Sequence, residues 1–78
     1  MKDRIPKEEI EKWLTRIKKE LEIIEAIDKK GEEFLENINA YANDCEHFLK
    51  KGEYVLSFES VVWAWAYLEI GKDLKLLE

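Results

Sequence analysis

The sequence has few of the residues from which catalytic, metal-binding and disulfide-linked sites are made. It contains one cysteine, one histidine and two arginines in 78 residues. A single cysteine excludes an internal disulfide and a zinc site built from thiolates. A single histidine, His47, excludes the paired Glu-x-x-His ligands of di-metal helical bundles. We therefore expect a protein that is not an enzyme and that has no catalytic, metal-binding or cofactor-binding residues.

Cys45 and His47 are also poorly placed for chemistry. On a helical projection Cys45 falls in the middle of an apolar face, where a thiol behaves as a small hydrophobic side chain. His47 is turned away from that face. We predict that Cys45 is a buried structural thiol and that His47 is solvated.

Long apolar runs and concentrated basic patches are missing as well. No segment approaches the roughly 20 apolar residues that span a bilayer, and the first residues contain no apolar signal segment. The net charge is −5, and the lysine pairs lie among glutamates, which opposes binding to nucleic acid. We expect a cytoplasmic protein with neither a membrane nor a nucleic-acid partner.

The residues that are present favour helices. Hydrophobic residues make up 46% of the chain and charged residues 40%, with 14 glutamates, 11 lysines and no glutamine. Glutamate and lysine are strong helix formers and pair along exposed helix faces. The same bias is typical of proteins from hyperthermophiles. The composition therefore predicts a thermostable all-α protein.

Three helices are expected, at about residues 7–28, 32–51 and 53–70, followed by a short tail. Pro6 suits the first turn of the first helix. Apolar residues recur at steps of three and four along the first helix and share one face of the second. These residues are Ile10, Leu14, Ile17, Leu21 and Ile24, then Phe34, Ile38, Tyr41, Ala42, Cys45, Phe48 and Leu49.

Glycines mark the expected helix ends. Gly31 and Gly52 can take the left-handed conformation that ends a helix, and Gly71 is expected to end or kink the third one. The linkers are then short, which makes neighbouring helices antiparallel. We predict that residues 1–78 form one domain, an up-and-down three-helix bundle.

The third helix has more apolar surface than one core needs. One broad face is predicted to be the core; it contains Tyr54, Val55, Phe58, Val61, Val62, Trp65 and Leu68. A narrow stripe of small residues, Ser57, Ser60 and Ala64, lies beside that face. Leu56, Trp63 and Ile70 point elsewhere, and the leucines at 74, 76 and 77 predict a tail that folds back onto the bundle.

The segment from Tyr41 to Gly71 resembles the archaeal domain-of-unknown-function family catalogued as number 357. The residues that carry the resemblance are Tyr41, Asp44, Phe48, Gly52-Glu53, Phe58-Glu59, Trp63-Ala64 and Leu68-Glu69-Ile70-Gly71. The resemblance implies an archaeal origin and a three-helix bundle with left-handed twist, similar to immunoglobulin- and albumin-binding modules. It implies no function.

Two groups of residues are candidates for a site. Glu69 falls within the predicted core face, and a buried carboxylate needs a polar partner. We expect Glu69 to join Asn37, Tyr41 and Asp44 in a polar cluster between the second and third helices. That cluster is either a structural device or, as an alternative function, part of an accessory domain that binds a small molecule or nucleotide.

Leu56, Trp63 and Ile70 form the second candidate, an interaction surface. Tryptophan is enriched where protein surfaces bind one another. The leading hypothesis is a non-enzymatic interaction or oligomerisation module, which buries this surface against a copy of itself or against another protein. The opposing interpretation is that the first helix or the tail covers it.

Overall fold

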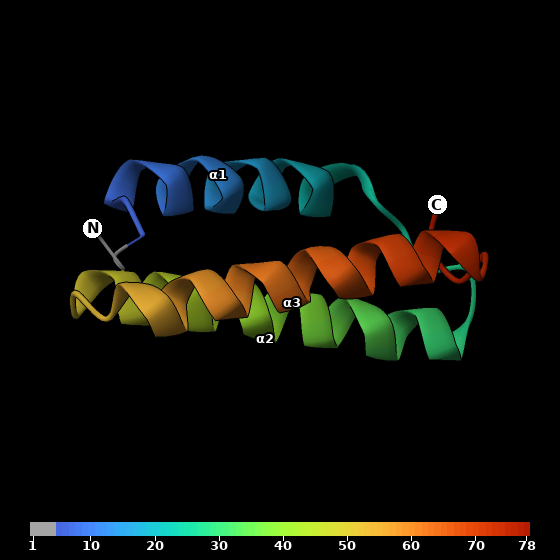
Figure 1. Ribbon diagram of the computed structural model, residues 1–78. Coiled ribbons are helices and arrows are strands. Elements are labelled where there is room, and N and C mark those ends of the chain that lie inside the picture. The colour runs from blue at the N-terminus through green and yellow to red at the C-terminus, as the bar shows by residue number, and fades with distance from the viewer. Residues whose placement is uncertain (1–4) are drawn as a thin grey trace.

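A computed structural model describes residues 5–78 and contains three helices: α1, Lys7–Ile23; α2, Lys29–Lys50; and α3, Tyr54–Asp73. α1 and α3 run in one direction and α2 in the other (Figure 1). The predicted all-α, up-and-down three-helix bundle is confirmed. Residues 1–4, on which the prediction about a signal segment partly rests, lie outside the described range. None of the helices described is both long and apolar enough to cross a membrane.

The first helix is shorter than predicted. α1 ends at Ile23, and Ile24 is already extended, with φ −79° and ψ 145°. Asp28, which was expected within the first helix, instead begins the second one, because its carboxylate accepts a hydrogen bond of 2.9 Å from the Gly31 N–H. Three of the apolar residues predicted to share one face of this helix, Ile10, Leu14 and Ile17, are nevertheless buried.

The predictions for Gly31 and Gly71 were wrong. Gly31 lies in the first turn of α2, and Gly71 lies within α3, which continues to Asp73. Both are buried because the C-terminal tail crosses them. A Cβ on Gly31 would overlap the Leu76 carbonyl oxygen, and one on Gly71 would lie 2.5 Å from Leu77 Cδ1. Only Gly52, with φ +77°, is the left-handed turn glycine that was predicted.

The tail folds back, as expected, and pairs with the linker between α1 and α2. An antiparallel bridge joins Ala26 to Leu77. Glu25 and Glu78 exchange backbone hydrogen bonds of 2.7 and 2.9 Å, and the Ile27 N–H donates to the Leu76 carbonyl at 2.9 Å. Leu77 is 3% exposed. The tail therefore closes one end of the bundle.

The core of α3 is rotated from its predicted position. Its buried residues are Ser57, Ser60, Val61, Ala64, Leu68 and Gly71, whereas Val55 and Val62 from the predicted core face are 53% and 47% exposed. The small side chain of Ser57 on α3 contacts Cys45 on α2, and these two helices pack closely. α1 lies farther away (Figure 1), because it presents large side chains. Small size, and not hydrophobicity, decides which side of α3 faces α2.

Candidate functional site

The predicted polar cluster is not formed. Glu69, which was expected in the core, is exposed, and so are Asn37 and Asp44, while Tyr41 is half-buried. Among residues 5–78 the four side chains make no hydrogen bond to one another; the amide of Asn39, by comparison, does donate to the Leu35 carbonyl. The rotation of α3 is the reason, because it turns the side that carries Val62 and Glu69 outward. Glu69 therefore needs no buried partner.

The predicted interaction surface, in contrast, is exposed along its whole length. Leu56, Trp63 and Ile70 are 43%, 55% and 48% exposed, and Leu74 extends the line at 61%. We call these four residues, together with Tyr41 of α2, the Trp63 face. Trp63 lies two residues before Trp65, so the two side chains point about 200° apart around the helix axis. Since Trp65 contacts α1, the Trp63 face lies on the side of α3 away from α1.

A ladder of aromatic rings supports the Trp63 face from within. Trp63 stacks on Tyr41 with ring centroids 6.3 Å apart, and Tyr41 stacks on Tyr67 at 5.6 Å. Tyr67 in turn meets the edge of Phe34 at 5.4 Å. These contacts restrict the Trp63 side chain, so that burying it against another surface would cost little further conformational entropy. The ladder also explains why Tyr41 belongs with Trp63 and not with Glu69.

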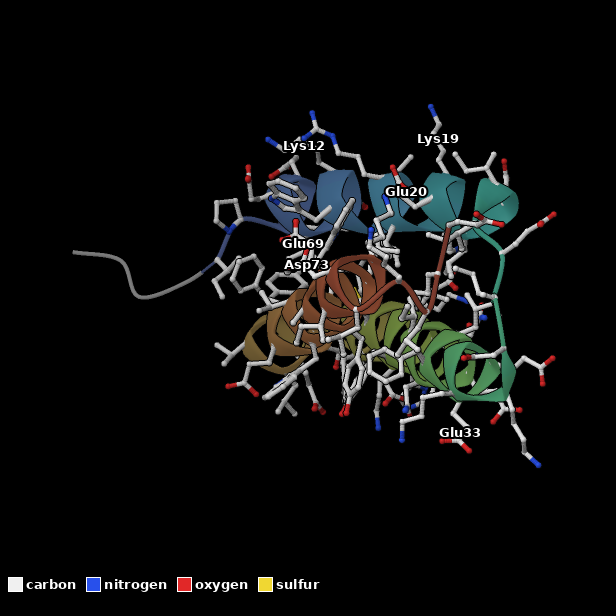
Figure 2. All side chains as sticks on the ribbon, turned by 90° about the vertical axis from the view of Figure 1, so that its right-hand side faces the viewer. Lys12, Lys19, Glu20, Glu33, Glu69 and Asp73 are labelled. Atoms are coloured by element: carbon white, nitrogen blue, oxygen red, sulfur yellow. The ribbon has the colours of Figure 1, made fainter. Side chains whose placement is uncertain are left out.

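Polar residues of α2 border this face. Asn37 and Asp44 lie one turn before and one turn after Tyr41, so they share its side of the helix. Glu33 projects from α2 on the side of the molecule away from α1 (Figure 2). The Trp63 face is thus an apolar strip with a polar rim, which is the usual anatomy of a protein interface.

A second apolar feature lies between α1 and α3. It is a groove of about 260 Å³ lined by Trp13, Phe58, Val61, Val62 and Trp65. The rings of Trp13 and Trp65 meet edge to face at 5.8 Å, and Trp65 Nε1 donates to the Trp13 carbonyl at 3.3 Å. All five lining side chains are aliphatic or aromatic, and none of them can serve as an acid or a base.

Charged side chains contact the outer side of Trp13. Its Nε1 donates a hydrogen bond of 2.9 Å to Glu9, and the Arg16 guanidinium lies 5.1 Å from its ring. The hydrogen bonds that Glu9 accepts from Trp13 and from Lys12 lower the pKa of the Glu9 carboxyl. These contacts hold the indole at the edge of the groove.

A more polar cleft of about 440 Å³ lies at the start of α1 and the end of α2, at the end of the bundle away from the C-terminal tail. Its lining includes Lys7, Glu11, Glu46 and Lys50. Lys7 pairs with Glu11 at 4.0 Å, and Glu46 with Lys18 at 3.1 Å. Because opposite charges compensate one another here, the cleft selects for neither anions nor cations.

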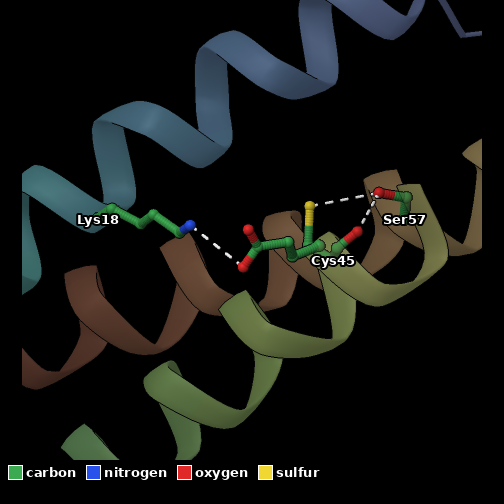
Figure 3. Close-up of polar contacts among 4 residues, drawn as sticks. Lys18, Cys45 and Ser57 are labelled. Carbon is green, nitrogen blue, oxygen red and sulfur yellow. Dashed lines mark hydrogen bonds and ion pairs between the residues drawn. The ribbon is translucent and has the colours of Figure 1, made fainter. Parts of the chain in front are cut away.

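Cys45 is fully buried, as predicted, and it is paired with a serine (Figure 3). The Ser57 hydroxyl donates to the Cys45 carbonyl at 2.7 Å and lies 3.3 Å from the sulfur. Burial raises the pKa of the Cys45 thiol, which keeps it protonated and unreactive. His47 is exposed and meets the edge of Phe48 at 5.6 Å. Both residues have the structural surroundings expected from the sequence.

Comparison with known proteins yields a family and a fold. Residues 12–77 match the family model described as protein of unknown function, DUF357. The crystal structure of a protein from Archaeoglobus fulgidus that carries the same family model is 47% identical, with a TM-score of 0.85. The match covers 92% of this chain and 90% of that chain. Among curated proteins the comparison finds no match. The resemblance inferred from residues 41–71 is confirmed, and the match extends back into α1.

Proposed function

Because the chain belongs to the DUF357 family, whose description names no activity, we propose its function from its surface: a non-enzymatic protein-interaction module that binds through the Trp63 face. The archaeal relative and the glutamate- and lysine-rich composition support a thermostable archaeal protein. The single free cysteine fits the reducing cytoplasm.

The exposure of Trp63 is the observation that carries this proposal. A tryptophan that is 55% exposed and continues into three exposed aliphatic residues is an apolar strip that soluble proteins normally keep covered. The two elements that were candidates to cover it lie elsewhere. α1 packs on the Trp65 side of α3, and the tail places Leu77 against Gly71.

The chemistry of the face favours binding over catalysis. Leucine, isoleucine and tryptophan side chains contribute buried apolar area, at about 25 cal/mol per Å², but they transfer no proton and bind no metal ion. The alternative function, binding of a small molecule or nucleotide between α2 and α3, has lost its main support, because the exposed side chains of Asn37, Asp44 and Glu69 form no common site.

Site-specific photo-crosslinking tests the proposal. Benzoylphenylalanine at position 63 preserves a large aromatic side chain, and the same residue at position 62 is the matched control, because Val62 is 47% exposed on another side of α3. After irradiation in cells, position 63 should give one defined protein adduct, identified by mass spectrometry as a second copy or as one specific protein. Position 62 should give much less of it. Equal adduct yields from the two positions would contradict the proposed function.

A further inference from the structure

We infer that the occupant of the Trp63 face is a second copy of this chain, related by a two-fold axis that sets the two α3 helices antiparallel at Trp63. This inference rests on the proposed function and adds the identity and geometry of the partner. It is carried by the symmetry of the apolar strip, by the charges beside it and by its area.

The apolar strip is symmetric about its centre. Leu56 lies seven residues before Trp63, and Ile70 lies seven residues after it. A seven-residue step returns to nearly the same side of a helix, and the exposures of 43%, 55% and 48% are similar. A two-fold axis through Trp63 therefore places Trp63 against Trp63 and, twice, Leu56 against Ile70 of the second copy. Isologous dimers need this kind of self-complementary surface.

The charges on α2 are complementary in the same arrangement. Tyr41 stacks on Trp63 and so marks the centre of the face on α2. Glu33 and Lys51 are eighteen residues apart, which is five full turns, so they lie on the same side of the helix. They also lie at nearly equal distances from Tyr41, eight residues before it and ten after it. The two-fold axis therefore brings Glu33 close to Lys51 of the second copy, at both ends of the interface.

Glu33 already pairs with Lys30 at 3.6 Å, but both side chains are more than half exposed, so its carboxylate can be shared with a second lysine. Nearer the centre, Asp44 comes opposite Asn37 of the second copy, where the amide N–H can donate to the carboxylate. A parallel pairing of the two α3 helices would instead place the two α2 helices on opposite sides of the α3 pair, where Glu33 does not reach Lys51 of the second copy. Only the antiparallel pairing sets these opposite charges against each other across the interface.

The available area matches a standard interface. The molecule is 44 Å long and 21 by 17 Å in section, so one long face covers about 750 to 900 Å². Covering such a face completely on both copies would bury about 1,500 to 1,800 Å², an upper bound that lies within the range of about 1,200 to 2,000 Å² for stable complexes. The dimer must therefore use the whole length of α2 and α3, from Lys51 to Leu74.

Analytical ultracentrifugation of the full chain tests the identity of the partner. We expect wild type to sediment at twice its 9.3 kDa mass at high micromolar concentration. Trp63→Glu should be monomeric with an unchanged helical circular dichroism spectrum, while Val62→Glu should remain a dimer. A monomeric wild type at every concentration overturns the inference, even where crosslinking at position 63 identifies another protein and so supports the proposed function. A dimer that survives Trp63→Glu overturns it as well.

Engineered cysteines test the geometry. Leu56→Cys chains oxidised alone should form little disulfide, whereas Leu56→Cys chains mixed with Ile70→Cys chains should form a mixed disulfide efficiently. Cys45 does not interfere, because it is fully buried. Efficient disulfides from Leu56→Cys alone would show a parallel dimer and overturn the antiparallel arrangement.

Charge reversal gives an independent check of the geometry. Glu33→Lys and Lys51→Glu should each weaken dimerisation by about threefold to tenfold, since each variant places like charges together twice. The double variant should recover most of that loss. Melting of each variant, followed at monomer concentrations, separates this effect from any change in the stability of α2. Additive losses in the double variant would contradict the pairing of Glu33 with Lys51.

Discussion

Replacing Gly31 with alanine should destabilise this protein, although alanine is normally the better residue within a helix. Helix propensity alone predicts a gain of about 0.5 to 1 kcal/mol from this change. In the folded chain, however, the new Cβ would overlap the Leu76 carbonyl oxygen, a backbone atom that cannot rotate away. The C-terminal tail therefore has to leave its position on α2.

The cost of releasing the tail is dominated by Leu77. This side chain is 3% exposed, and exposing a buried leucine costs about 2 to 3 kcal/mol. Subtracting the helix-propensity gain leaves a net destabilisation of about 1 to 2.5 kcal/mol. For a domain of this size, that corresponds to a melting temperature lower by about 4 to 20 °C.

Thermal and urea unfolding, followed by circular dichroism, should be measured in two backgrounds: the full chain and a chain that ends at Asp73. In the shortened chain Gly31→Ala should become neutral or stabilising, because the Leu76 carbonyl is gone. Gly52→Ala is the control. It should cost about 1 kcal/mol in both backgrounds, since the penalty comes only from its φ of +77° and no atom lies within 4 Å of the new Cβ. A higher melting temperature for Gly31→Ala in the full chain would refute this reasoning.

Two further predictions concern titratable groups. Cys45 should react with thiol reagents only as the protein unfolds, and because its pKa is raised above the ordinary 9.0 in the folded state, stability should decrease as the pH rises above that value. Urea unfolding of wild type and Cys45→Ala at alkaline pH measures this effect, and equal pH dependence in the two would contradict it. Glu9 has a lowered pKa, so its contribution to stability should be present above the ordinary 4.5 and lost as the pH falls through its lower folded value. Glu9→Gln should flatten that acid limb in urea unfolding, and an unchanged limb would show that the contacts from Trp13 and Lys12 are not formed.

Local patterns were sufficient for the helices and for most of their buried faces. The three-and-four spacing in α1 predicted Ile10, Leu14 and Ile17 as core, and the apolar face of α2 predicted Ile38, Ala42 and Cys45. These predictions succeed because periodicity is a property of the single helix. The composition likewise predicted an all-α protein. Within residues 5–78 the structure has no strand, apart from the isolated bridge between Ala26 and Leu77.

The candidate site was only partly predictable. Trp63 was identified as exposed and Tyr41 as a site residue, but the two were assigned to different groups. The close packing of α2 on α3 joins them into one stack, with ring centroids 6.3 Å apart. The sequence places Glu69 in the core because the core face of α3 is predicted from its large apolar residues and not from its small residues, Ser57, Ser60 and Ala64. A close contact between two helices selects small residues instead, and one helix alone does not reveal that contact.

By itself, then, the sequence determined the number of helices, their order and their antiparallel course, because these follow from periodicity, turn residues and linker length. Tertiary structure decided the structural roles of Gly31 and Gly71 and the rotation of α3. Gly31 and Gly71 look like helix ends in the chain, but in the bundle they are the two places where the tail crosses a helix. The small residues Ser57, Ser60 and Ala64 bring α3 against α2, and that contact leaves Trp63 outside. Both outcomes depend on contacts between segments that are far apart in the sequence.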